Sequence, residues 1–208
     1  MINIISSSSK GNAVIYGKQI LVDCGVPFAL IQPFLADLRL VLLTHEHGDH
    51  FNFATIKRLA FEKPTLRFAC GEFLKDKMKG IKNLDIVKPD LDKYNIYDYG
   101  QFIIVPVVLY HDVPNFGYRI IFDNQTIFHA TDTAHLNGIS AKGYDYYCLE
   151  HNYDEETINQ TIQAKESRGE FAHERGAINS HLSCQQAQSF YFENKKETSQ
   201  IIRLHETK

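Results

Sequence analysis

The sequence lacks a long apolar run: no stretch approaches the roughly 18 residues that a membrane-spanning helix needs. Its four cysteines lie far apart and form no CxxC pair, which is typical of reduced thiols in a cytosolic protein. The opening MINIISSSSKGN lacks the basic region and apolar core of a signal peptide. We therefore expect a cytoplasmic protein without a membrane segment.

Positive charge is not in excess either, because 22 basic residues face 25 acidic ones and the formal net charge is -3. No global positive field would attract nucleic acid or an anionic membrane, so any nucleic-acid affinity would need a local patch. With 208 residues, of which 44% are hydrophobic, the chain is long enough for a large core. We expect a single domain over residues 1–208, without internal repeats or linkers.

Short apolar runs rich in β-branched and aromatic residues predict strands, because Gly, Asn, Asp or Pro bound them. These runs are Ala13–Tyr16, Ile20–Asp23, Leu40–Leu43, Leu66–Ala69, Phe102–Leu109, Tyr118–Phe122, Thr126–His129, Tyr146–Glu150 and Gln200–His205. Helical spacing and capping residues predict helices from Pro27 to about Asp37, over Asn52–Glu62, Glu72–Lys79 and Asp154–Lys165, and after Ser183. Two groups of strands mixed with helices indicate two sheets flanked by helices.

The stretch LTHEHGDH places three histidines and two carboxylates within six residues, directly after an apolar run. Imidazole nitrogens and carboxylate oxygens are metal ligands, and left unpaired these groups would be costly to desolvate. In an extended chain His45 and His47 point to one side. Gly48 is expected to allow a tight turn that brings Asp49 and His50 towards a second position. The spacing therefore predicts two adjacent metals, with Glu46 pointing away from both.

LTHEHGDH resembles the HxHxDH signature of the metallo-β-lactamase superfamily, and further landmarks follow in the family's order over nearly the whole chain. The segments SSSSKGNAVIYGKQILVDCG, YHDVPNFGYRI, HATDTAH, LEHNYD and NSHLS resemble those of a nuclease-like branch that includes the YycJ (WalJ) proteins. The resemblance implies an α+β fold, a four-layer αβ/βα sandwich in which two mixed sheets are flanked by helices.

The resemblance also implies further site residues. His111 would be the third ligand of the first metal, and Asp132 the carboxylate that bridges both metals. The last ligand in this superfamily follows the last core strand, which favours His205, with His181 as the alternative. In the related tRNA 3′-processing endonucleases a histidine before a helix donates a proton and a glutamate holds it. By that resemblance His181 is the donor and Glu150 its partner.

This ligand set implies two divalent ions, expected to be Zn2+, with Mn2+ as the alternative. Two such ions about 3.5–4 Å apart can hold a bridging hydroxide and polarise a phosphoryl oxygen. Asp49 would bind a metal and accept a hydrogen bond from that nucleophile, while His181 would protonate the leaving oxygen. Ser8 and Asn12 are weaker candidates, for contacts with substrate phosphate oxygens at the edge of the site.

The superfamily hydrolyses β-lactams, thioesters, lactones and phosphodiesters, so the fold does not decide the substrate. Asp132 and the Glu150–His181 pair favour phosphodiesters. Two substrates stay open: a 3′,5′-cyclic nucleotide, as for the anti-Pycsar phosphodiesterases, and DNA or RNA, as for the YycJ branch. The acidic balance and compact length favour the cyclic nucleotide narrowly. A non-catalytic metal-binding or nucleotide-sequestering module is a further alternative, and so is a homodimer, because members of the superfamily often dimerise.

Overall fold

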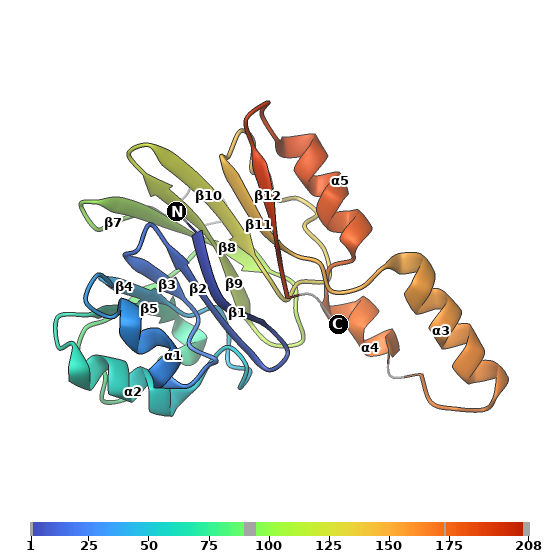
Figure 1. The fold of residues 1–208 in the computed structure, drawn as a ribbon, viewed down its shortest axis with the longest axis horizontal. Coiled ribbons are helices and arrows are strands. Elements are labelled where there is room, and N and C mark those ends of the chain that lie inside the picture. Colours follow the sequence, from blue (N-terminus) through green and yellow to red (C-terminus); the bar gives the residue numbers. More distant parts are fainter. Residues whose placement is uncertain (1, 90–94, 173, 206–208) are drawn as a thin grey trace. The chain divides into compact units, whose positions relative to one another are not determined.

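The computed structural model describes residues 2–89, 95–172 and 174–205 of the chain. They form two compact units, unit 1 over Met1–Asp90 and unit 2 over Leu91–Lys208. Each unit is built around a mixed sheet of six strands with its own helices (Figure 1). The predicted α+β class, two mixed sheets flanked by helices, is confirmed. The single domain over residues 1–208 stays a prediction.

The sheet of unit 1 follows the order of its strands along the chain. These strands are β1 (Ile2–Ser8), β2 (Gly11–Tyr16), β3 (Ile20–Val22), β4 (Leu40–Leu42), β5 (Arg67–Gly71) and β6 (Leu84–Val87). Pairing is antiparallel from β1 to β3 and parallel from β3 to β6. Parallel neighbours need crossover connections. Here the crossovers carry α1 (Phe28–Ile31), the 3-10 turn η1 (Gln32–Phe34), α2 (Phe53–Glu62) and the 3-10 turn η2 (Glu72–Leu74).

Helix α2 anchors the β4–β5 crossover to the sheet. Its N-cap Asn52 accepts a hydrogen bond from the Thr55 backbone N–H at 3.2 Å, which satisfies one open donor of the first turn. Ile56 and Leu59, one turn apart, are fully buried in a core that also contains Val41 of β4. Because β3 and β4 are parallel, the segments after both strands begin at the same edge of the sheet.

Two predicted helices of unit 1 are shorter than expected. The helix from Pro27 to about Asp37 is a single α-helical turn followed by η1, because Pro33 lacks the N–H that an α-helix would use there. The helix over Glu72–Lys79 is only η2 followed by turns. Leu74 and Met78 are its fully buried side chains, so little apolar surface stabilises a longer helix.

Unit 2 contains a second mixed sheet, in the order β12–β11–β10–β9–β8–β7. Its strands are β7 (Tyr97–Asp98), β8 (Phe102–Leu109), β9 (Asn115–Phe122), β10 (Gln125–Ala130), β11 (Tyr146–Glu150) and β12 (Gln200–Leu204). Pairing is antiparallel from β7 to β10 and parallel from β10 to β12. The helices are α3 (Glu155–Ser167), α4 (Glu174–Ser180) and α5 (Cys184–Asn194). Strands β1, β6 and β7 and helix α4 were not predicted.

Helix α5 packs on the sheet of unit 2 and begins near the ends of two parallel strands. Ser183 and Gln186 form a capping box at its start, and Phe190 packs against Phe128 and Tyr147 of the sheet. Leu182, just before the helix, donates its N–H to Glu150 at the end of β11. The chain before α5 is therefore held at the edge where β10 and β11 end.

Helices α3 and α4 form an arm that extends beyond this sheet (Figure 1). Ile158, Ile162 and Ala172 make a small buried cluster of their own, with Ala177 and Ile178 packed against it. No helix in the described ranges is long and apolar enough to cross a membrane.

Candidate metal centre

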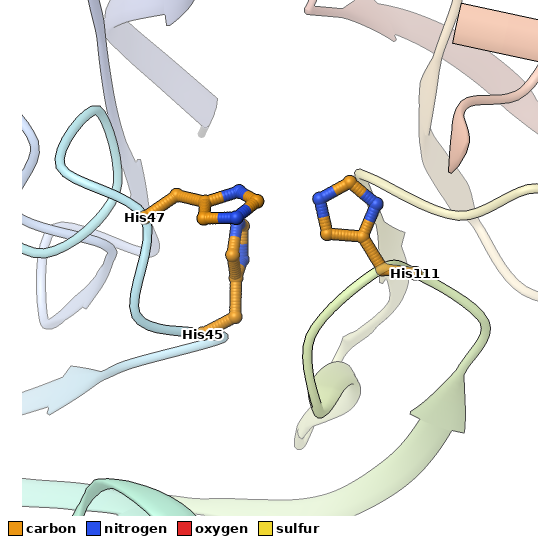
Figure 2. Close-up of side chains that lie close together, drawn as sticks. All are labelled: His45, His47 and His111. Carbon is orange, nitrogen blue, oxygen red and sulfur yellow. The ribbon is translucent and has the colours of Figure 1, made fainter. Parts of the chain in front are cut away.

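The histidines of LTHEHGDH come together in unit 1, in the loop that follows β4. His45 and His47 project from this loop (Figure 2), with ring centroids 4.8 Å apart. The rings of His45 and His50 are closer, at 4.2 Å. The predicted grouping of these side chains is therefore present. Glu46 instead pairs with Lys77 at 2.9 Å, in agreement with the expectation that it points away.

Asp23 holds this loop in place, a role that the sequence did not reveal. It follows β3, is almost fully buried and adopts a positive φ of 63°. Its carboxylate accepts hydrogen bonds from the backbone N–H of Thr44 at 2.9 Å and from its hydroxyl at 2.8 Å. It also lies 2.6 Å from Nδ1 of His50, so an Nδ1–H donor there leaves the free lone pair of the ring on Nε2. The sequence feature that could have indicated this role is the position of Asp23 in ILVDCG, directly after a buried strand.

Asn12 braces the same loop from β2. Its backbone N–H donates to the carbonyl of Asp49 at 2.7 Å, and its side-chain Nδ2 lies 3.2 Å from Oδ2 of Asp49 and 2.8 Å from Nε2 of His50. Nδ2 also donates to the carbonyl of Ser8 at 3.0 Å, while the Ser8 hydroxyl accepts from the backbone N–H of Lys10 at 3.3 Å. The phosphate-contact role for Ser8 and Asn12 stays a prediction.

Gly25, rather than Gly48, is the glycine on which the loop depends. A Cβ at Gly25 would lie 1.6 Å from the carbonyl oxygen of Asp49, far inside van der Waals contact. A Cβ at Gly48 would meet no atom within 4 Å, and Gly48 is not among the positive-φ residues. The predicted tight turn at Gly48 is present, because the backbone N–H of His50 donates to the carbonyl of His47 at 2.9 Å across it, although the φ of Gly48 does not require a glycine.

His111 occupies the loop after β8 in unit 2 (Figure 2). Its Nδ1–H donates to the carbonyl of Ser180 at 2.8 Å, and Nε2 lies 3.0 Å from the exposed carboxylate of Asp112. Burial lowers the pKa of His111, although the Asp132 charge and the Ser180 carbonyl oppose the shift. A neutral imidazole is the form that binds a metal.

Asp132 follows β10 and is almost fully buried, with a φ of 56°. The side-chain amide of Asn115 supports this turn by donating to the carbonyls of Thr131 at 3.0 Å and Asp132 at 2.6 Å. Asn115 is a second supporting residue that the sequence did not indicate, because its partners Thr131 and Asp132 lie 16 and 17 residues further along the chain.

Glu150 is the centre of a buried polar network at the end of β11. One carboxylate oxygen, Oε1, lies 2.5 Å from Nδ1 of His181 and 3.1 Å from Nδ1 of His205. The other, Oε2, accepts the backbone N–H groups of Thr133 at 3.2 Å and Leu182 at 3.1 Å. An ionised carboxylate has about four acceptor positions, so this network uses the capacity of Glu150.

The pKa of His181 is raised by this network. Burial lowers it, but the hydrogen bond and charge of Glu150, together with the charge of Asp132, outweigh burial. His181 lies 3.5 Å from Asp132 through Nδ1, and its ring stacks on that of His205 with centroids 5.4 Å apart. The predicted pairing of Glu150 with His181 therefore has a geometric basis.

The donor groups of unit 2 suit a divalent metal. One potential ligand atom from each of Asp132, Glu150, His181 and His205 lies within 4.8 Å of the other three. Carboxylate oxygen and imidazole nitrogen together match the ligand preferences of zinc and manganese rather than those of calcium. The chemistry of this set fits the predicted metal, while the assignment of each ligand remains a prediction.

Comparison with known proteins identifies the family of this chain. A UPF0173 metal-dependent hydrolase of Pyrococcus abyssi is 28% identical over 59% of this chain and 59% of its own length. The exodeoxyribonuclease WalJ of Streptococcus pneumoniae is 29% identical over 75% of this chain and 64% of its own length. The chain thus spans less than two thirds of either relative.

The solved structure of the short form of human tRNase Z superposes on 99% of this chain and 92% of its own, with a TM-score of 0.70 and 14% identity. This likeness shows a shared fold. The family model described as Beta-lactamase superfamily domain matches residues 18–187, most of the chain. The chain therefore belongs to the β-lactamase superfamily, and its structural likeness to a metallo-β-lactamase fold protein of Bacillus subtilis, with a TM-score of 0.70 and 18% identity over 99% of this chain and 85% of that one, shows that fold.

Proposed function

We propose that this protein hydrolyses phosphodiester bonds with the help of two divalent metal ions, Zn2+ in the first instance. The observation that carries the proposal is the pairing of buried Glu150 with the partly exposed His181 beside Asp132, which can deliver a proton to a leaving alkoxide. The names of the relatives support it, since one is a metal-dependent hydrolase and another an exodeoxyribonuclease.

The proposed ligands share imidazole or carboxylate chemistry. They are His45, His47, Asp49, His50, His111, Asp132 and His205. Bound ions would supply the Lewis acidity that polarises a phosphoryl oxygen and lowers the pKa of water. Asp49 would also accept a hydrogen bond from the attacking water, and Asn12 helps to hold its carboxylate.

His181 is proposed as the proton donor. Its Nδ1 faces Glu150, and Nε2 makes no hydrogen bond with any described residue, so Nε2 is the nitrogen that can reach a substrate oxygen. The raised pKa keeps a proton on the imidazole closer to neutral pH. Transfer of that proton to the leaving oxygen would avoid the departure of a strongly basic alkoxide.

Burial separates the roles of His181 and His205. The side chain of His205 is 5% exposed, whereas that of His181 is 20% exposed, although both contact Glu150. A donor must reach the substrate, while a ligand is better shielded from water. This difference supports His205 as the last ligand and His181 as the donor.

Two different observations favour two different substrates. A small cyclic nucleotide is favoured by charge pairing in the basic run Lys75–Lys82, where Lys75 pairs with Glu72 and Lys77 with Glu46. Such pairing reduces the positive charge that could follow a nucleic-acid backbone. DNA is favoured by the likeness to WalJ. Because of these ion pairs we rank the cyclic nucleotide first, and one assay tests both substrate classes.

The test is a hydrolysis assay of the zinc- and manganese-loaded protein against 3′,5′-cyclic nucleotides, DNA oligonucleotides and RNA oligonucleotides. Asp49→Ala provides the blank, because it removes a proposed ligand. Cleavage of any of them by the wild type but not the variant supports phosphodiester hydrolysis and identifies the substrate. Nucleotide binding without cleavage would instead support the sequestering module and contradict the proposal.

A further inference from the structure

A pocket of about 850 Å³ lies beside His181, between α3, α4 and the segment that follows β11. Every residue that lines it belongs to unit 2. Its volume falls within the range of about 300–1000 Å³ that is common for small-molecule sites. His181 therefore belongs both to the Glu150 network and to the wall of a ligand-sized pocket.

The lining of this pocket is chemically distinctive. Tyr153, Ile158 and Ala177 provide aromatic and apolar surface, while Asp154 and Glu174 contribute carboxylates. None of the described residues that line it is a lysine or an arginine. Apart from His181 at its wall, the pocket offers no cationic side chain to a phosphate group, and its carboxylate Glu174 already pairs with Lys165.

We propose that this pocket binds the uncharged nucleoside part of the leaving group, an inference that rests on the proposed function. A nucleobase offers a flat apolar face to Tyr153 and Ile158, and sugar hydroxyls and base amino groups can donate to carboxylates and threonine hydroxyls. The leaving oxygen belongs to the same nucleoside, so a nucleoside in the pocket presents that oxygen to His181.

Gly176 of α4 offers a way to fill the pocket. It lines the pocket, and a Cβ there would meet no atom within 4 Å, so a larger side chain enters open space. Replacing a helical glycine also favours the helix. Gly176→Leu is therefore expected to fold, and Thr161→Leu fills the same pocket from α3. Asn179→Leu is the matched control, because Asn179 is exposed on α4 and does not line the pocket.

The first experiment measures the binding of adenosine and thymidine by isothermal titration calorimetry, without any need for turnover. We expect at least one nucleoside to bind the wild type and Asn179→Leu, with affinity reduced about 10-fold or more in Gly176→Leu and Thr161→Leu. Failure of both nucleosides to bind the wild type would overturn the inference. Equal affinity in the wild type and both pocket variants would also overturn it.

The second experiment separates this inference from the proposed function. The zinc-loaded proteins are assayed with bis(4-nitrophenyl) phosphate, which has no nucleoside, and with the nucleotide substrate that the wild type cleaves. The pocket variants should raise KM about 10-fold more for the nucleotide than for the nitrophenyl ester. An equal effect on both would contradict the pocket's role, whereas hydrolysis of neither by the wild type would contradict the proposed function.

Discussion

Oε1 of Glu150 lies 2.5 Å from Nδ1 of His181, and both groups stand at the edge of the sheet where β11 ends. The carboxylate is fully buried, while the imidazole is partly exposed. This arrangement places a charged hydrogen-bond acceptor behind the imidazole and leaves the far nitrogen for a substrate, as a proton donor requires.

Glu150→Gln should reduce kcat for a nucleotide substrate about 100-fold, because the amide cannot stabilise a protonated His181. His181→Ala should have a similar effect, and the double variant should be little worse than either single variant, since the two residues act as one unit. Steady-state kinetics of the three variants test this. Glu197→Gln, an exposed position, is the control. If the losses in kcat of the two single variants multiplied in the double variant, the two residues would act independently and the pairing would be contradicted.

Asp23→Asn should weaken metal binding about 10–100-fold, because the carboxylate orients His50 through Nδ1 and fixes Thr44. Competition with a chromophoric chelator measures the zinc affinity. The exposed Asp37, changed to Asn, should bind zinc as the wild type does. An unchanged affinity in Asp23→Asn would exclude Asp23 from the support of the metal centre.

Gly25→Ala should disturb the Asp49 loop, because its Cβ would overlap the Asp49 carbonyl. We expect a fall in Tm of roughly 5–10 °C, which corresponds to a few kcal/mol for a chain of this size. Gly48→Ala in the same loop has open space around its Cβ and should change Tm by less than about 2 °C. Thermal unfolding followed by circular dichroism compares the two, and equal Tm values would refute the steric account.

The HxHxDH loop could be predicted because its ligands are adjacent in sequence and follow a buried strand. The role of Asp23 in holding the loop could not be predicted, because Asp23 contacts Thr44 and His50 only through the parallel register of β3 and β4. Helix α4 was missed for a similar reason. Its sequence ERGAINS has little apolar periodicity, and its stability comes from the cluster that Ala177 and Ile178 share with α3.

Asp145→Asn should destabilise unit 2 by about 1–2 kcal/mol at pH 7. Asp145 pairs with Lys196 at 2.5 Å and accepts from the backbone N–H and hydroxyl of Thr126 at 2.8 and 2.9 Å. The hydrogen bond to Lys196 lowers the pKa of this carboxyl most, and together with the Thr126 bonds and the Lys196 charge it outweighs burial, which raises the pKa.

Because the folded-state pKa of Asp145 is depressed, its stabilising contribution is full above the unfolded-state value of about 3.9 and is lost as pH falls through the folded-state value. The difference in unfolding free energy between wild type and Asp145→Asn should therefore stay constant from pH 7 to 5 and narrow below about pH 4. Urea denaturation over this range measures it, with the exposed Asp76→Asn as control. A difference that widens in acid would contradict the assignment.

The central claim is that His181, held by Glu150, protonates the leaving oxygen of a phosphodiester. The most direct measurement compares wild type and His181→Ala, both zinc-loaded, on bis(4-nitrophenyl) phosphate and on the nucleotide that the wild type cleaves, which is an alkyl ester. The first releases 4-nitrophenolate, which leaves without a proton, and the second releases a nucleoside alkoxide, which needs one. We predict a loss in kcat of about 100-fold or more for the alkyl ester and less than about 10-fold for the nitrophenyl ester. An equal loss for both esters would contradict His181 as the proton donor.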